Sequence, residues 1–223
     1  MCASKLLRRS GVAVGLVAEM LNWRADVVVQ AGVGQRHQEV DVLTEEWPGV
    51  RFIGFEPYPL DPKEYNGQLY PSALGCEIGH KTLHVKKRHK DGASLHPFDA
   101  DVTAKEIPID VTTLDWFIRQ TDNYFLLRKR LLLWLDCEGS ELDVLRGAKE
   151  FIEYVNVVNV EITAKPPSPK WNDPLAVHYW LVEHGFIRQW IHTQNIASGQ
   201  FDAIYVRPYL FKPEYCCDPW SKV

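Results

Sequence analysis

Cysteine is scarce in this chain of 223 residues, which contains five in all. No two cysteines stand in the C-x-x-C spacing of a zinc site, and the adjacent Cys216 and Cys217 would form a strained bridge with each other. The pattern therefore argues against a disulfide framework and against a zinc-binding module. This usage of cysteine favours a reducing compartment, and we expect the protein to be cytoplasmic.

Long apolar runs are also lacking. No stretch approaches the roughly 20 apolar residues that a membrane-spanning helix needs. The stretch KLLRRSGVAVGLVAEML (5–21) has basic residues before an apolar segment, as signal peptides do. Glu19 interrupts that segment, however, and no small-residue cleavage site follows it. We therefore expect an amphipathic helix near the N-terminus and no membrane span.

Neither sign of charge dominates, because 25 basic residues stand against 29 acidic ones and give a formal net charge of −4. This balance offers no electrostatic basis for binding nucleic acid. With 46% hydrophobic and 24% charged residues, the composition is that of a globular protein with one sizeable core. No linker or repeat is evident, so we predict a single domain with an N-terminal helix (1–25), a core (26–208) and a C-terminal tail (209–223).

Apolar runs typical of buried strands alternate with helical patterns along the core. The predicted strands are 26–32, 50–57, 130–139 and 155–162, and the predicted helices are 35–47, 141–152 and 175–185. Strands separated by helices predict a doubly wound, mostly parallel α/β sheet. Two final strands, 186–193 and 200–208, should pair as a hairpin. That hairpin would place an antiparallel strand in the sheet, as in the Rossmann-like fold of class I methyltransferases.

The middle of the chain has a less regular pattern. Residues 70–80 are strand-like and punctuated by glycine. Residues 81–95 alternate around Asp91-Gly92, which predicts a surface hairpin. Its basic segment KKRHK (86–90) is typical of a solvated hairpin face.

Two further helices should begin at capping residues. Within 108–120 a strand end is followed by Thr112 and Thr113, and either hydroxyl can cap a helix. Ser140 should likewise cap the helix that follows the most hydrophobic strand.

In a doubly wound sheet the ligand lies beyond the carboxyl ends of the strands. The first predicted strand ends there in a glycine turn, and glycine lets the backbone approach a ligand closely. His37 stands where a dinucleotide-binding turn has its third glycine, which favours a ligand without a pyrophosphate, although a tight turn without a ligand is equally open. The candidate cofactor-binding residues of the turn are Gln30, Ala31, Gly32 and Gly34.

Glu56, followed by Pro57, stands at the tip of the second predicted strand, about 20 residues after the glycine turn. Carboxylates at this point hold the hydroxyl groups of ribose, because a carboxylate is an acceptor that fits two neighbouring O–H donors. Helix capping or simple exposure of Glu56 is the alternative. Together the two features indicate an adenosine with an unphosphorylated ribose.

Acidic residues also follow the most hydrophobic strand. Asp136 and Glu138 are two apart, so both should face one side where that strand ends, and Gly139 then turns the chain. Acids in such an apolar setting are costly unless they meet a ligand, a metal or a donor, although ordinary solvated acids remain the alternative. Glu161, at the end of the next strand, is a further catalytic candidate or a structural residue.

Several of these segments together resemble the FkbM family of S-adenosylmethionine-dependent methyltransferases. They occur in the family's order over roughly residues 26–208, and the "EP" and D-x-EG-x-E-x-x-L-x-GA elements are its most specific parts. The segments are DVVVQAGVG, FIGFEPYP, SALG, TTLDWF, LLLWLDCEGSELDVLRGA, VVNVEI and EHGFI. The resemblance implies a class I fold, S-adenosylmethionine as cofactor and, usually, O-methylation of sugars or natural products.

The resemblance also implies roles for individual residues. The glycine turn from Gln30 to Gly34 would border the methionine moiety, Glu56 would bind the ribose, and Asp136 and Glu138 would face the methyl-transfer centre. Gln30 departs from the family, which usually has Asp there, so weaker cofactor affinity is expected. The residues implied near the adenine are Ser72, Ala73 and Leu74, and Ser94 is implied at the rim of the active site.

Other interpretations of the same residues stay open. Asp136 and Glu138 could form the metal and nucleotide-sugar site of a glycosyltransferase, or the chain could be a cofactor-binding module without turnover. We predict no metal site otherwise, a small-molecule or saccharide acceptor, and no particular oligomeric state. Aromatic residues near the proline-rich loop could stack on a sugar or fill the core (Trp171, Tyr179 and Trp180). Three histidines lack the spacing of metal ligands and are expected in the core or at the surface (His178, His184 and His192).

Overall fold

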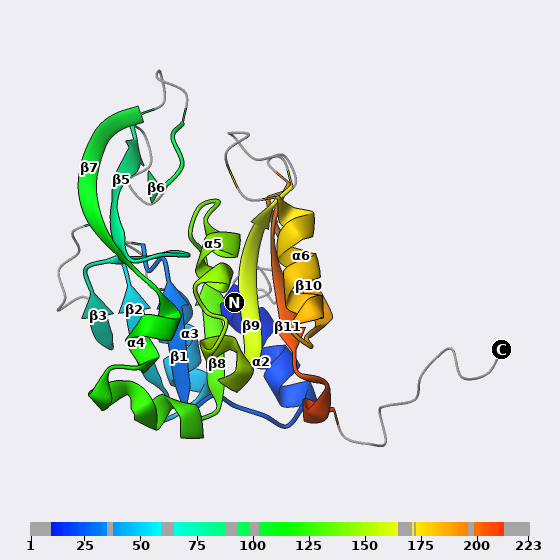
Figure 1. The fold of residues 1–223 in the computed structure, drawn as a ribbon. Coiled ribbons are helices and arrows are strands. Elements are labelled where there is room, and N and C mark those ends of the chain that lie inside the picture. The colour runs from blue at the N-terminus through cyan, green and yellow to red at the C-terminus, as the bar shows by residue number, and fades with distance from the viewer. Residues whose placement is uncertain are drawn as a thin grey trace.

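The computed structural model describes residues 10–34, 38–58, 65–87, 93–98, 103–164, 171, 173–195 and 199–211. Its largest element is a seven-stranded sheet with the strand order β3-β2-β1-β8-β9-β11-β10 (Figure 1). In chain order these strands are β1 (Val27–Ala31), β2 (Arg51–Phe55), β3 (Gln68–Tyr70), β8 (Leu131–Leu135), β9 (Val155–Thr163), β10 (Ile187–Asn195) and β11 (Gln200–Val206).

The strand directions confirm the predicted fold. Strands β1, β2, β3, β8 and β9 pair with one another in parallel. Strand β11 lies between β9 and β10 and pairs antiparallel with both. The predicted C-terminal hairpin is therefore present, and it inserts one antiparallel strand into an otherwise parallel sheet.

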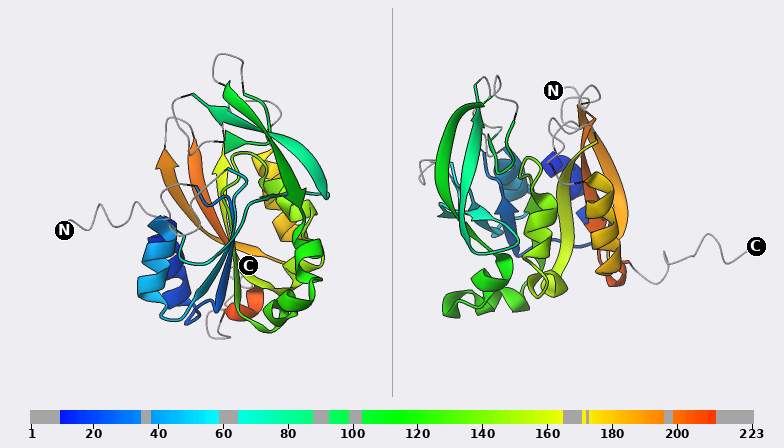
Figure 2. Two further views of the ribbon diagram at one scale, coloured as in Figure 1. Left: turned by 90° about the vertical axis from the view of Figure 1, so that its left-hand side faces the viewer. Right: turned by 45° about the horizontal axis from the view of Figure 1, so that its top comes forward.

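Helices cover both faces of this sheet (Figure 2). The helices are α2 (Ser10–Met20), α3 (Gln38–Glu46), α4 (Leu114–Ile118), α5 (Glu141–Arg146) and α6 (Pro174–Glu183). Because side chains alternate along a strand, Val27 and Val29 pack with α4, α5 and α6, whereas Val28 packs with α2 and α3. All five residues of β1 and of β8 are buried, as a parallel sheet between two helix layers requires. Each fully buried valine or leucine stabilises the fold by roughly 1.5–3 kcal/mol.

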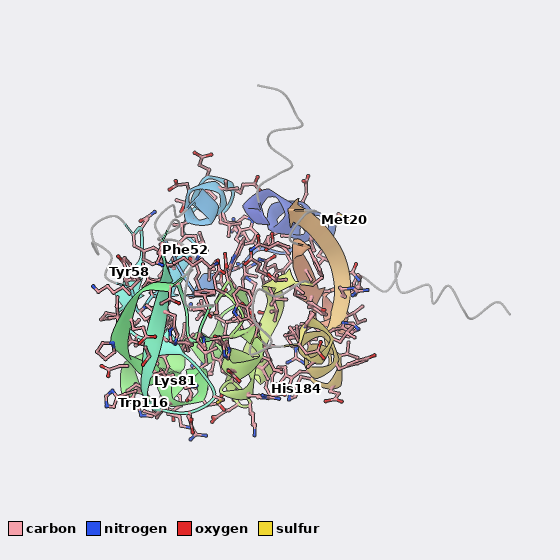
Figure 3. All side chains as sticks on the ribbon, turned by 90° about the horizontal axis from the view of Figure 1, so that it is seen from above. Met20, Phe52, Tyr58, Lys81, Trp116 and His184 are labelled. Atoms are coloured by element: carbon pink, nitrogen blue, oxygen red, sulfur yellow. The ribbon has the colours of Figure 1, made fainter. Side chains whose placement is uncertain are left out.

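A second, four-stranded sheet rises above the carboxyl ends of the central strands (Figure 1). Its order is β4-β7-β5-β6, with β4 (Ala73–Leu74), β7 (Thr103–Thr112), β5 (Gly79–Lys86) and β6 (Ala93–Ser94). Figure 3 looks down on the molecule and shows Lys81 of this sheet on one side and His184, which follows α6, on the other. The carboxyl ends of the central strands lie between these two parts.

The second sheet confirms one prediction and corrects another. Strands β5 and β6 pair antiparallel, which confirms the hairpin predicted over 81–95, whereas its predicted turn at Asp91-Gly92 lies outside the described residues. Residues 70–80 do not form one strand. They are divided among the end of β3, the short β4 and the start of β5.

The caps predicted for two helices have different outcomes. Thr113 caps α4, because its side-chain oxygen accepts a hydrogen bond from the backbone N–H of Trp116 at 3.1 Å. Ser140 stands before α5 but makes no side-chain cap bond, and its buried hydroxyl has no hydrogen-bond partner among the described residues. The prediction that Ser140 caps the helix by its side chain is wrong.

The predicted helix boundaries shift most around α5. The helix predicted over 141–152 ends at Arg146, because Gly147 forms its C-cap and a 3₁₀ segment, η2 (Phe151–Tyr154), follows. The other helices keep their predicted places, and residues 35–37 before α3 lie outside the described part of the chain. No helix within the described ranges is long and apolar enough to cross a membrane.

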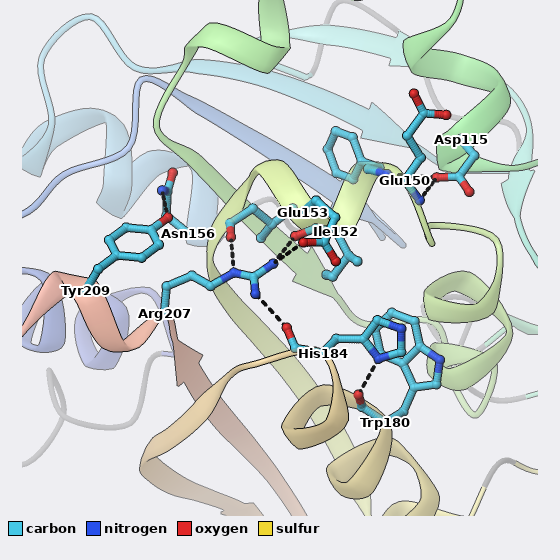
Figure 4. Close-up of polar contacts among 11 residues, drawn as sticks. Asp115, Glu150, Ile152, Glu153, Asn156, Trp180, His184, Arg207 and Tyr209 are labelled. Atoms are coloured by element: carbon cyan, nitrogen blue, oxygen red, sulfur yellow. Dashed lines mark hydrogen bonds and ion pairs between the residues drawn. The ribbon is translucent and has the colours of Figure 1, made fainter.

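Arg207, which follows β11, fixes the far end of the antiparallel strand. Its guanidinium donates hydrogen bonds to the backbone oxygens of Val155 at 3.1 Å, His184 at 2.5 Å and Ile152 at 2.6 Å (Figure 4). It also lies 4.1 Å from the ring centroid of Phe186. These contacts join the end of β11 to η2, to the start of β9 and to the turn after α6.

Candidate active site

The register of the central strands sets four residues in one row at the carboxyl edge of the sheet. Ala31 of β1 is aligned with Phe55 of β2 and with Leu135 of β8, and Leu135 is aligned with Val160 of β9. Adjacent strands lie about 4.8 Å apart, so the row spans roughly 14 Å of backbone from β2 to β9. The residues that follow the aligned positions are Glu56, Gly32, Asp136 and Glu161.

The two glycines of the turn differ in what surrounds the position of a Cβ atom. Gly32 has a φ of +78°, and a Cβ there would lie 1.8 Å from the backbone oxygen of Asp136. Its close approach is therefore to β8, whose Asp136 N–H also donates to the Ala31 oxygen at 2.9 Å. Gly34 has a φ of +63°, and a Cβ there would meet nothing within 4 Å. Of these two glycines, Gly34 borders open space, and the approach of a ligand to the turn stays a prediction.

Glu56 holds the glycine turn through its carboxylate. One oxygen, Oε2, accepts hydrogen bonds from the N–H groups of Val33 and Gly34, both at 3.1 Å. The other oxygen, Oε1, accepts the N–H of Tyr58 at 2.8 Å. The side chain is 9% exposed, so this carboxylate is neither free in solvent nor part of a helix cap. These bonds set the carboxylate directly beside the glycine turn at the carboxyl edge of the sheet.

Asp136 and Glu161 form a pair of carboxyl groups that hydrogen-bond to each other at the ends of β8 and β9. Burial raises the pKa of Asp136 well above its usual range, and the charges of Glu161 and Glu138 raise it further. Burial also raises the pKa of Glu161, which the hydrogen bond with Asp136 partly offsets. Asp136 is therefore the hydrogen-bond donor of the pair, and the pKa of its partner Glu161 is raised to about 8, so ionised Glu161 increases as the pH rises through that value.

Asp202 brings a further acid beside this pair. It lies on β11 directly opposite Glu161 and is 2% exposed. Sequence reasoning missed it because its place depends on the antiparallel register of the final hairpin.

Two residues that sequence reasoning did not assign also contact the loop after β8. Glu141 is 7% exposed, and its Oε1 accepts the N–H groups of Cys137 at 3.0 Å and Gly139 at 3.1 Å. Burial raises the pKa of Glu141 to about 7, although these hydrogen bonds act in the opposite direction. Lys86 of β5 places its Nζ 3.1 Å from Oε2 of Glu138. The prediction that KKRHK is wholly a solvated face is thus wrong at its first residue.

The remaining predicted cofactor residues lie around the row and differ in their burial and in their hydrogen bonds. Gln30 is 3% exposed, and its Oε1 accepts the hydroxyl of Tyr65 at 3.4 Å. Ala73 and Leu74 are buried in β4, so only their backbones could reach a ligand. Pro57 and Ser72 are half-buried, whereas His37 lies outside the described residues.

Trp171 is the one aromatic of the predicted sugar-stacking set that reaches the row. It lines a small cavity with Gly139, Glu141 and Glu161, and a Cβ on Gly139 would lie 2.3 Å from its indole ring. Its indole N–H is buried and has no hydrogen-bond partner among the described residues. By contrast, Tyr179 is 60% exposed.

Trp180 and two of the predicted core or surface histidines contact other residues of the fold. The ring of Trp180 stacks on His184, with 3.6 Å between centroids. His178 Nδ1 lies 3.0 Å from the hydroxyl of Tyr205, and the side chain of His192 is outside the described residues. Among the residues that the structure describes, no group of three His, Cys, Asp or Glu side chains could hold a metal ion.

The strand order, the single antiparallel strand and the residues gathered beyond the carboxyl ends define a class I methyltransferase fold. A candidate methyltransferase from Thermobifida fusca YX has a similar structure, with a TM-score of 0.52, 9% identity, and coverage of 92% of this chain and 79% of that chain. Magnesium protoporphyrin IX methyltransferase from Synechocystis PCC 6803, solved with bound SAM, gives a TM-score of 0.48 at 10% identity and covers 90% of this chain and 79% of its own.

The sequence matches the methyltransferase FkbM domain over residues 21–195. The chain therefore belongs to the FkbM family of S-adenosylmethionine-dependent methyltransferases, as its motifs suggested. No curated protein is significantly similar to the chain.

Proposed function

We propose that this protein transfers a methyl group from S-adenosylmethionine to a hydroxyl group of a small metabolite or saccharide. The observation that carries the proposal is the hydrogen-bonded pair of Asp136 and Glu161, because it sets two buried carboxyl groups with raised pKa values in the same row as the glycine turn and Glu56. A base close to the cofactor is what removal of a hydroxyl proton needs.

The residues of the row fit the cofactor in two respects. Gly34 has a backbone N–H at the turn and open space where a side chain would stand. Glu56 accepts that N–H, so its carboxylate stands beside the turn at the carboxyl end of β2, where a carboxylate can bind ribose hydroxyl groups. We therefore assign Glu56 to the ribose and the turn from Gly32 to Gly34 to the methionine moiety. Gln30 would accept a hydrogen bond from the amino group but supplies no countercharge, and the adenine would lie near the backbone of Ser72 to Leu74.

The chain's own part in the reaction is orientation and proton transfer. When bound, S-adenosylmethionine supplies a methyl group on a positively charged sulfur. Glu161 in its ionised form, which increases as the pH rises through about 8, can accept the proton of the acceptor hydroxyl at a carboxylate oxygen as that hydroxyl oxygen attacks. Trp171 lines the adjoining cavity together with Gly139, Glu141 and Glu161. Because the displacement is in line, alignment of the two reactants supplies much of the rate.

Calorimetric titration tests this proposal against the two alternatives. We expect S-adenosylmethionine and S-adenosylhomocysteine to bind, and UDP with Mn²⁺ to give no heat, since the described residues contain no metal-binding group. Incubation with a panel of methyl glycosides should then release S-adenosylhomocysteine. Binding without turnover over that panel and a panel of small alcohols would favour a cofactor-binding module, and a response to UDP and Mn²⁺ alone would favour a glycosyltransferase.

We also propose that the protein works in the cytoplasm. The structure places Cys76 and Cys137 as free thiols, which agrees with a reducing compartment.

A further inference from the structure

Glu138 occupies a backbone conformation that its residue type disfavours. Its φ is 49°, in the left-handed region that costs a non-glycine residue roughly 1 kcal/mol or more. Such a conformation persists only where surrounding contacts fix it. Three residues supply those contacts, and we call Lys86, Ser94 and Glu141 the Glu138 clamp.

The first member of the clamp holds the backbone on both sides of Glu138. The Oε1 atom of Glu141 accepts the N–H of Cys137, which precedes Glu138, and the N–H of Gly139, which follows it, at 3.0 and 3.1 Å. One buried oxygen thus holds the peptide group between Glu138 and Gly139, which sets the ψ of Glu138, and the peptide group between Asp136 and Cys137.

The other two members come from the second sheet. Ser94 of β6 is 1% exposed and donates its hydroxyl to the backbone oxygen of Glu138 at 2.6 Å, while the same hydroxyl accepts the N–H of His96 at 3.0 Å. Lys86 binds the carboxylate of Glu138 at 3.1 Å. Its Nζ lies 4.7 Å from the ring centroid of Phe98 and 5.9 Å from that of Trp171. The β5–β6 hairpin therefore reaches into the site.

Ser94 and Glu141 thus hold the backbone at Glu138, and Lys86 binds its carboxylate. The Glu138 carboxylate is only partly buried, with 19% of the side chain exposed, so it remains open to a ligand from one side. Gly139, the next residue, contacts Trp171 and lines the cavity beside Glu161. The charge of Glu138 acts on both Asp136 and Glu161, so its carboxylate lies beside that pair.

We propose that Lys86, Ser94 and Glu141 are positioning residues for methyl transfer, which act by holding the Glu138 carboxylate where it orients the acceptor. This inference rests on the proposed function. It assigns the β5–β6 hairpin a part in turnover, although the hairpin lies outside the central sheet. Loss of a clamp contact should lower kcat and leave cofactor affinity unchanged, because the clamp does not touch the Glu56 end of the row.

The test compares Lys86→Met, Ser94→Ala, Glu141→Ala and Glu141→Gln with Lys105→Met, the control for Lys86→Met on an exposed lysine of β7 in the same sheet. Lys86→Met should lose kcat as the two alanine variants do. We expect kcat, measured with S-adenosylmethionine and a methyl glycoside, to fall about 10- to 100-fold in the two alanine variants, since a displacement of about 1 Å can have that effect. Glu141→Gln should stay within about threefold of the wild type, because its amide oxygen can accept both N–H groups. The control should not change.

Two results would overturn the clamp. One is an unchanged kcat in both alanine variants. The other is a fall in kcat accompanied by a loss of cofactor affinity and a lower melting temperature, as a merely structural role would give. Amide hydrogen exchange at residues 136–140 needs no turnover and keeps the clamp testable if the wild type proves inactive. Faster exchange in Ser94→Ala and Glu141→Ala supports the clamp even when the proposed function fails, and unchanged exchange contradicts it.

Discussion

The double variant Asp136→Asn/Glu161→Gln is expected to lose methyl transfer by about 10²- to 10⁴-fold in kcat, the range that a positioned general base supplies. Each single substitution leaves one carboxylate of the pair, so its effect should be smaller and the two effects should not add. S-adenosylmethionine should still bind, since Glu56 and the glycine turn are unchanged. Single-turnover kinetics with a methyl glycoside, together with calorimetry, measure the two quantities separately.

The stability of this double variant supplies the control. Burial raises the pKa of both carboxyls, so folding favours their protonated forms. Unfolded Asp and Glu titrate near pH 4, and the wild type should therefore lose free energy of unfolding as the pH rises from about 4 through the raised pKa values. The variant lacks these groups, so its unfolding free energy should depend less on pH. A variant that is inactive because it is unfolded at every pH would argue for a structural role of the pair.

Gly32→Ala should have the largest effect on stability. A methyl group there would lie 1.8 Å from the Asp136 oxygen, and the φ of +78° adds left-handed strain. The clash is with backbone at the junction of β1 and β8 and cannot be relieved by a side-chain rotation, so we expect a loss of about 3 kcal/mol or more in unfolding free energy. Urea denaturation measures it.

Gly34→Ala is the matched control for this change. Its φ is also positive, but its methyl group would enter open space, so only about 1 kcal/mol of strain is expected. The same methyl group would enter the space assigned to the methionine moiety, so affinity for S-adenosylmethionine should fall. Equal losses of stability in the two variants would contradict the distinct roles of the two glycines.

The central sheet was predictable because its strands are short apolar runs between turn signals. The strand after Arg130 and the hairpin at the C-terminus could be placed from periodicity alone. The second sheet was only partly predictable. Strand β7 begins at Thr103, but its polar residues and Pro108 give no continuous strand signal before Ile109. The α5 helix was predicted too long because its apolar period continues past Gly147, where the chain tightens into a 3₁₀ segment.

The residues of the site were predictable to different degrees for the same physical reason. Glu56 and Asp136 could be selected because each follows a buried strand, and Glu161 because it stands near the end of one, since parallel strands end at one edge. Lys86 and Glu141 were missed, since their contacts with the loop after β8 depend on how separate elements pack. Glu141 was already visible in the D-x-EG-x-E pattern, which could have marked it. Lys86 carried no signal beyond the charge of its neighbours.

Binding of the ribose by the Glu56 carboxylate is the contact on which the cofactor assignment rests. Affinities of S-adenosylhomocysteine and its 2′,3′-dideoxy analogue, measured by calorimetry for the wild type and for Glu56→Gln, form a double cycle that isolates this contact. We expect the wild type to prefer the natural ribose by about 100-fold, as two hydrogen bonds to a carboxylate allow, and the variant to lose most of that preference. An equal preference for the natural ribose in both proteins would contradict the assignment.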